Sequence, residues 1–147
     1  MIPKNSLIIK QPGKIIITCE KKSNIYSLKQ MFDLQYRKNI EFLPLPYVNN
    51  MPDLPSLLDV LGKRGCVELL IEGGEKVFTS FFEQNLIDKV IAFISPKIIG
   101  GSKSPTPFAG LGIQSLANCP SLDNIKIKKV GQDLMVSGYL TEKKFNL

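Results

Sequence analysis

Apolar residues fall along the chain in short runs with two different spacings, and these runs predict alternating strands and helices. Runs rich in β-branched residues favour buried strands, and we expect them at residues 14–19, 40–45, 67–71 and 88–95. Apolar residues at helical spacing predict helices over residues 23–39, over residues 54–61 and after Gly74. Asp53 is placed to cap the second of these helices, and Asn85 is placed to end the third.

The order of these elements predicts an α/β fold. Strand 67–71, the following helix and strand 88–95 read as a βαβ unit with parallel strands. Residues 96–120 are rich in Gly, Pro and Ser and read as a long loop, with one turn of helix. Beyond it, alternating Ile and Lys residues and a turn at Gly131-Gln132 indicate an antiparallel hairpin with one solvated face. We therefore expect one domain over residues 1–147, with a mixed sheet that is parallel in the middle and antiparallel at its C-terminal edge.

The composition of the chain excludes several classes of catalytic and metal site. The 147 residues include no histidine, which excludes a Ser-His-Asp triad, a Cys-His dyad and a His-ligated metal site within this chain. The three cysteines are widely scattered, so neither a zinc site nor a disulfide framework is indicated. Hydride transfer suits the remaining residue types, because a cofactor carries the difficult step.

The net charge of +6 has three explanations. Lysines exposed to solvent are the first, and an anionic small molecule such as a phosphate-bearing cofactor is the second. Nucleic acid is the weakest, because aromatic residues do not alternate with the basic ones. The apolar runs are too short for a membrane span, and the N-terminal residues do not form a signal peptide, so we expect a cytoplasmic protein.

The junction Glu72-Gly73-Gly74, between an apolar run and a helical pattern, is the strongest candidate for a binding site. A helix that starts near Gly74 presents free N–H groups, and glycine lets a phosphate approach the backbone closely. The two common nucleotide fingerprints, GxGxxG and GxxxxGK[ST], are absent, and a tight turn without a ligand fits the same pattern. The partner of the Glu72 carboxylate would be a ligand N–H or O–H group, or else solvent or a lysine. Glu75 lies in the first turn of the helix, where its negative charge interacts favourably with the helix dipole.

Several motifs in the second half of the chain resemble one family, the reductase domain of the bifunctional riboflavin-biosynthesis deaminase/reductase. The matching motifs are Glu72-Gly73-Gly74, Leu86-Ile87-Asp88, Pro96-Lys97-Ile98-Ile99-Gly100-Gly101 and Gly131-Gln132-Asp133. The resemblance extends over residues 1–141 and is specific from Val67 onward. It implies a dihydrofolate-reductase-like fold, a mixed sheet with flanking helices.

The resemblance also implies a reaction and its site. The family uses NADPH to reduce the ribosyl group of 5-amino-6-(phosphoribosylamino)uracil to the ribityl form. By resemblance, Glu72 contacts the substrate, no residue is assigned as catalytic, and no metal is required. The cofactor-binding residues implied are Gly73, Gly74, Glu75, Lys76, Val77, Phe78, Thr79 and Ser80. The implied assembly is a homo-oligomer, a dimer, with neither nucleic acid nor membrane as a partner.

The family's leading motifs, a strand with S-x-D-G and a cofactor loop that ends near D-D-P, do not occur in this sequence. The zinc-binding deaminase domain does not occur either. We therefore expect the chain to be the C-terminal part of a reductase domain, with the leading strands outside it. Two functions stay open at this point: a reductase that carries part of its site here, and a non-catalytic remnant that folds and binds nucleotide.

Overall fold

The computed structural model describes residues 6–31, 39–110 and 112–141. The chain divides into two compact units, residues 1–68 and 69–147. The expectation of one domain over the whole chain stays a prediction. Among the described residues, no helix has the length and apolar character needed to cross a membrane.

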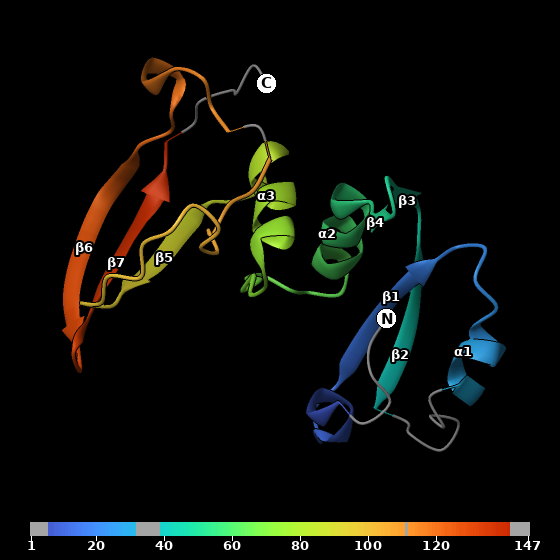
Figure 1. Ribbon diagram of the computed structural model, residues 1–147. Coiled ribbons are helices and arrows are strands. Elements are labelled where there is room, and N and C mark those ends of the chain that lie inside the picture. Colours follow the sequence, from blue (N-terminus) through green and yellow to red (C-terminus); the bar gives the residue numbers. More distant parts are fainter. Residues whose placement is uncertain (1–5, 32–38, 111, 142–147) are drawn as a thin grey trace. The chain divides into compact units, whose positions relative to one another are not determined.

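The first unit is built around two parallel strands that are joined through a helix. Its elements are the 3-10 helix η1 (Leu7–Lys10), β1 (Ile15–Glu20), α1 (Ile25–Met31), β2 (Ile40–Leu45), β3 (Tyr47–Val48), β4 (Met51–Pro52) and α2 (Leu54–Lys63). β1 and β2 pair in parallel, from Ile15 opposite Ile40 to Glu20 opposite Leu45 (Figure 1). Strand, helix and strand in this order form a βαβ arrangement.

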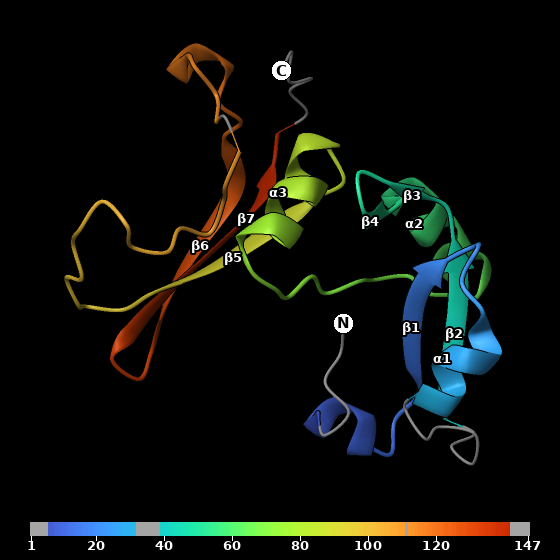
Figure 2. The ribbon, with the colours of Figure 1, turned by 45° about the vertical axis from the view of Figure 1, so that its right-hand side comes forward.

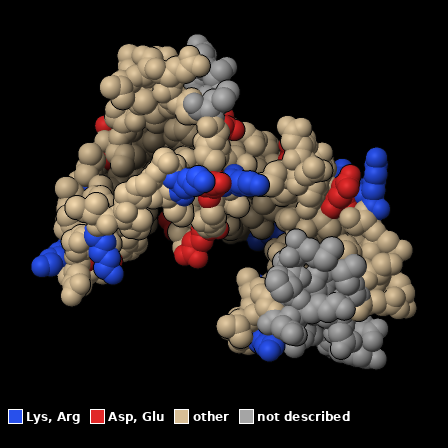
Figure 3. Space-filling view, in the orientation of Figure 1, with Lys and Arg blue, Asp and Glu red and all other residues tan. Residues whose placement is uncertain are grey.

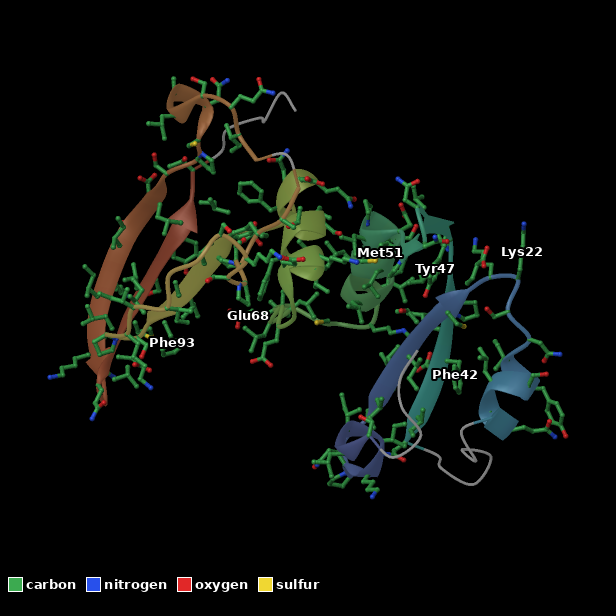
Figure 4. The ribbon with its side chains drawn as sticks, in the orientation of Figure 1. Lys22, Phe42, Tyr47, Met51, Glu68 and Phe93 are labelled. Carbon is green, nitrogen blue, oxygen red and sulfur yellow. The ribbon has the colours of Figure 1, made fainter. Side chains whose placement is uncertain are left out.

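One cluster of buried residues forms at the β1–β2 pair, and Leu43, Leu45 and Leu54 are buried as well. Ile9, Cys19, Ile40 and Phe42 are buried together, and the partly buried residues packed against them are Ile15, Ile17, Ile25 and Leu28. The Tyr47 hydroxyl donates a hydrogen bond to the Thr18 carbonyl at 3.3 Å, which ties the β3–β4 hairpin to β1 (Figure 4). Burial raises the pKa of the Cys19 thiol, so this cysteine belongs to the core.

Helix α2 is closed at its start by a side chain and tied to β2 at its end by an ion pair. Asp53 accepts a hydrogen bond from the Ser56 amide at 3.0 Å, which confirms the predicted N-cap. Arg64, the C-cap residue, donates two hydrogen bonds to Glu41 on β2, at 2.7 and 3.0 Å. Lys14 Nζ lies 3.4 Å from the same carboxylate. Glu41 therefore links the start of β1, β2 and the end of α2.

The second unit pairs one helix with an antiparallel sheet. Its elements are α3 (Glu75–Glu83), β5 (Lys89–Ile94), the 3-10 helix η2 (Leu116–Asn118), β6 (Leu122–Val130) and β7 (Asp133–Leu140). β7 lies between β5 and β6 and runs antiparallel to both, as Figure 1 shows. Gly131 has a φ of +61° in the two-residue turn between β6 and β7, which confirms the hairpin predicted there. The long segment between β5 and β6 swings away from the sheet and returns to it (Figure 2).

Two expectations need correction. Residues 67–71 form no strand, so the βαβ unit predicted over residues 67–95 is wrong, and the parallel pair is β1–β2 instead. A strand needs a hydrogen-bonded neighbour, and an apolar run does not show which neighbour that is. The hairpin also lacks the expected buried face, since Ile125 and Ile127 are 56% and 69% exposed. The helix expected over 23–39 is present as α1, and residues 32–38 lie outside the described residues.

The Glu41 carboxylate should make the stability of the chain depend on pH. Hydrogen bonds from Arg64 and the nearby charges of Arg64 and Lys14 lower the pKa of Glu41 below its ordinary value of 4.5. A lowered pKa stabilises the fold above the unfolded value, and that stabilisation disappears as the pH falls through the folded value. Glu41→Gln should therefore lower the Tm at pH 7, and the gap to the unmodified chain should narrow below about pH 4.5.

A matched control for Glu41→Gln is Asp59→Asn. Asp59 and Lys63 form an exposed i,i+4 pair on α2, with Nζ 2.6 Å from Oδ2. Such exposed ion pairs contribute little to the free energy of unfolding. Thermal unfolding of both variants from pH 3 to pH 7 makes the comparison. A Tm for Glu41→Gln that equals that of Asp59→Asn at every pH would contradict the linking role of Glu41.

Candidate functional site

The two glycines of the predicted junction differ in the space that each would leave for a side chain. At Gly73, an added Cβ would lie 3.0 Å from the Cβ of Val77, so this glycine lets the chain pack closely on the first turn of α3. At Gly74, an added Cβ would meet nothing within 4 Å. The Gly74 backbone, with φ −88° and ψ 178°, is also open to any residue. Neither packing nor backbone conformation within the chain therefore explains a glycine at position 74.

Gly74 is the N-cap of α3, and it leaves amide groups at the start of the helix without partners. Its carbonyl accepts from the amides of Val77 and Phe78, at 3.0 and 3.3 Å. No side chain caps the helix, and within the described residues the amides of Glu75 and Lys76 have no acceptor. Together with the positive end of the helix dipole, these N–H groups favour an anion in front of Gly74.

The charged side chains of the junction are exposed. Glu72, Glu75 and Lys76 all face solvent. Glu72 has neither a hydrogen bond nor an ion pair in the part of the chain that the structure describes, so the alternative of a lysine partner finds no support there. Its role as a substrate contact stays a prediction. Glu75 lies in the first turn of α3, where a carboxylate complements the helix dipole, as expected.

The later residues of the predicted cofactor segment point to other parts of the unit. Val77 packs beneath Gly73, and the Ser80 hydroxyl donates to the carbonyl of Lys76 at 2.8 Å. Phe78 packs against Phe108, with ring centroids 6.3 Å apart. Thr79 is 8% exposed, and its Oγ1 accepts a hydrogen bond from the Ala109 amide at 2.7 Å. The first turn of α3 and the side of the helix thus face different neighbours.

The contact of residues 108–110 with α3 was missed by sequence reasoning. Phe108 also packs against Phe82, with centroids 5.1 Å apart. A Cβ at Gly110, where φ is +83°, would lie 2.7 Å from Glu83 Oε1. About thirty residues separate the partners, so no local pattern joins them. A phenylalanine followed two residues later by a glycine, Phe108 and Gly110, is the signal that could have raised the question.

Upstream of that contact, the predicted Pro96-to-Gly101 motif forms a turn in the loop. Gly100 and Gly101 have φ values of +64° and +90°, which favour glycine at both positions. The Ser104 amide donates to the Gly101 carbonyl at 3.2 Å, and the Ser104 hydroxyl donates to Gly100. Ile98 and Ile99 are exposed, so the motif is held by its own backbone and not by a core.

The residues at the start of α3 fit a phosphate group and not a metal ion. The donors are backbone amides, and the open space in front of Gly74 admits a ligand close to the backbone. Among the described residues, no group of three or more Cys, Asp and Glu side chains could hold a metal. The start of α3 thus presents backbone donors that suit an anion, and the Glu72 carboxylate, which has no partner among the described residues, lies three residues before the helix begins.

Comparisons with known proteins now add to this geometry. Residues 2–136 match the family model described as the RibD C-terminal domain. The chain is 40% identical over 77 residues to the chloroplastic riboflavin biosynthesis protein PYRR of Arabidopsis thaliana, which covers 52% of this chain and 13% of that protein. It is 28% identical over 128 residues to the riboflavin biosynthesis protein RibD of a Synechocystis strain, covering 87% of this chain and 33% of that protein. The chain thus spans a third or less of the length of these relatives.

Solved structures show a similar fold. Acinetobacter baumannii RibD superimposes with a TM-score of 0.72 at 19% identity, covering 95% of this chain and 35% of that one. The riboflavin biosynthesis reductase Rib7 of Saccharomyces cerevisiae gives a TM-score of 0.63 at 17% identity, covering 92% of this chain and 60% of that one. At these identities the likeness concerns the fold alone. It confirms the expected α/β, dihydrofolate-reductase-like fold class.

Proposed function

The chain belongs to the RibD C-terminal domain family, and on that premise we propose that it carries part of the site of an NADPH-dependent pyrimidine reductase in riboflavin biosynthesis. In the proposed reaction, the ribosyl group of 5-amino-6-(phosphoribosylamino)uracil is reduced to the ribityl form. When bound, NADPH supplies the hydride. One observation carries the proposal: the start of α3 offers amides that have no acceptor among the described residues, beside a glycine whose added Cβ would meet none of those residues within 4 Å.

The cofactor would be held mainly through its phosphates. The amides of Glu75 and Lys76 donate to phosphate oxygens, and the dipole of α3 stabilises their negative charge. Lys76, exposed in the first turn, adds a positive charge beside them. Gly74 lets the phosphate reach the backbone, because no Cβ stands in the way. Gly73 acts indirectly, by letting the chain pack on Val77 and so fixing the start of the helix.

Glu72 would contact the substrate. Glu72 precedes the first residue of the helix by three positions, and its carboxylate has no partner in the described structure, so it is available to accept hydrogen bonds from a ligand. The pyrimidine and sugar of the proposed substrate carry N–H and O–H groups that suit this acceptor. The chain's part is thus to bind and orient two ligands at one junction, with the cofactor on the amides and the substrate on the carboxylate.

The cofactor site can be tested with a glycine that tolerates a side chain. Gly74→Ala should lower the Tm only slightly, because its Cβ meets nothing and only the N-cap preference for glycine over alanine is lost, yet it should raise the Kd for NADPH roughly tenfold or more, because the added Cβ hinders the approach of a phosphate to the amides. Fluorescence titration with NADPH, and with NADH in parallel, measures the affinity.

Two glycines of the same chain serve as controls for Gly74→Ala. Gly62→Ala, in α2, also places its Cβ in open space; it should stabilise the helix by about 0.5–1 kcal/mol and leave the NADPH affinity unchanged. Gly73→Ala should instead destabilise the fold by about 1–3 kcal/mol, since its Cβ would overlap Val77. Equal NADPH affinities for the Gly74→Ala and Gly62→Ala variants would refute the site at the start of α3.

Glu72 can be separated from the cofactor site by kinetics. Glu72→Gln removes the charge and keeps the size, so the Kd for NADPH should stay within about twofold while kcat/KM for the pyrimidine substrate falls at least about tenfold. Glu68→Gln is the matched control, because Glu68 is exposed in the segment between α2 and α3 (Figure 4). A large loss of NADPH affinity in Glu72→Gln would assign Glu72 to the cofactor instead.

We also propose a homo-oligomer, a dimer, and the sheet of the second unit supports it. Ile94, Leu134 and Ile127 share one face of that sheet and are 53%, 46% and 69% exposed. Charged side chains are sparse over much of this sheet in the view of Figure 3. Exposed apolar faces of this kind mark association sites. Light scattering should give a mass of twice 16.4 kDa, and Ile127→Lys should shift it toward the monomer; a monomer at all concentrations would contradict the dimer.

A further inference from the structure

Three consecutive loop residues are fastened to one side of α3. The Phe108 ring packs against Phe78 and Phe82, the Ala109 amide donates to Thr79, and Gly110 lies against Thr79 and Glu83. The helix residues involved are Phe78, Thr79, Phe82 and Glu83, which fall on one helical face. The loop therefore docks through an aromatic contact, a hydrogen bond and a close backbone approach.

Each of these contacts has its own physical requirement. The Ala109 amide is half-buried, so removing its acceptor would leave an unsatisfied donor. Gly110 combines a φ of +83° with a virtual Cβ only 3.3 Å from the Thr79 methyl group, so glycine is favoured there by both backbone and packing. Thr79 contacts two of the three loop residues, one through its hydroxyl and one through its methyl group. It is the side chain on which the docking depends most.

We propose that Thr79 is a positioning residue that holds loop residues 108–110 against the side of α3. Thr79 lies one turn after Glu75, about 6 Å along the helix axis. Its Oγ1 accepts a hydrogen bond from the Ala109 amide, so the side chain acts by ordering the loop and not by direct contact with the cofactor. The part of the proposal that concerns cofactor affinity rests on the proposed reductase function. The docking itself does not.

The loop contains its own reporters of docking. Lys97 and Lys103 are exposed in the loop that leads to the docked residues 108–110, so trypsin cleavage after them reports how much freer the loop becomes when these residues leave the helix. Lys22, exposed in a turn of the other unit, provides an internal reference in the same digest (Figure 4). The ratio of loop cleavage to Lys22 cleavage, read by mass spectrometry, needs neither cofactor nor activity.

Two substitutions at Thr79 separate its hydroxyl from its shape. Thr79→Val keeps the size and removes the acceptor, and it should raise the cleavage ratio roughly tenfold, as expected for a lost hydrogen bond. Thr79→Ser keeps the acceptor and should stay within about twofold of the unmodified chain. Equal ratios for Thr79→Val and the unmodified chain, or equal rises for both variants, would overturn the role of the hydroxyl.

A third substitution approaches the docking from the loop side. Phe108→Ala removes the ring that contacts Phe78 and Phe82 while leaving α3 intact, and Phe108 is already 40% exposed. Phe108→Ala should also raise the cleavage ratio. If circular dichroism shows that Thr79→Val does not fold, the Phe108→Ala variant tests the docking in its place. An unchanged ratio in Phe108→Ala would overturn the docking.

NADPH titration of the same variants tests whether the docked loop supports the cofactor site. Thr79→Val should raise the Kd several-fold and Thr79→Ser should not. Raised cleavage with an unchanged Kd would overturn the positioning role. Absence of NADPH binding in the unmodified chain would instead refute the proposed function, and the cleavage ratios would still decide whether Thr79 holds the loop.

Discussion

The amide groups in the first turn of a helix have no acceptor within the helix. In this chain, the residue that precedes the first turn of α3 is Gly74. No side chain caps α3, and the glycine before its first residue places no atom in front of the helix. The consequence is a patch of backbone donors with room for an anion. The features proposed for the site follow from these free amides. Gly74 leaves room for a phosphate to reach them, Glu72 lies two residues before Gly74, and the side of α3 holds loop residues 108–110.

The helix also explains why the predicted cofactor segment divides into two parts. Residues in the first turn have free amides because the helix has only begun, whereas residues one turn later have their amides bonded within the helix. From Val77 onward, only side chains are available for other contacts, and those of Phe78 and Thr79 are engaged by the loop. A segment that reads as one continuous cofactor site in the sequence is therefore two neighbouring surfaces in the structure.

Local features of the fold could be predicted because they depend on neighbouring residues. Asp53 caps α2 through the amide three residues on, Asn85 takes a φ of +55° after α3, and Gly131 turns the hairpin. Pairing could not be predicted in the same way, since residues 67–71 have the composition of a strand but pair with no strand in the part of the chain that the structure describes. The bond between Thr79 and Ala109 was out of reach for the same reason, because its partners are distant in sequence.

The reductase proposal is tested most directly by following the hydride. The chain would be incubated with the phosphoribosylamino-pyrimidine substrate and NADPH carrying deuterium at C4 of the nicotinamide, and the product would be examined by mass spectrometry. The account predicts a ribityl product that carries one deuterium, with loss of the label when Gly74 is replaced by alanine. NADPH that binds at the start of α3 without any transfer of deuterium would contradict it and would favour a remnant that binds nucleotide but does not catalyse.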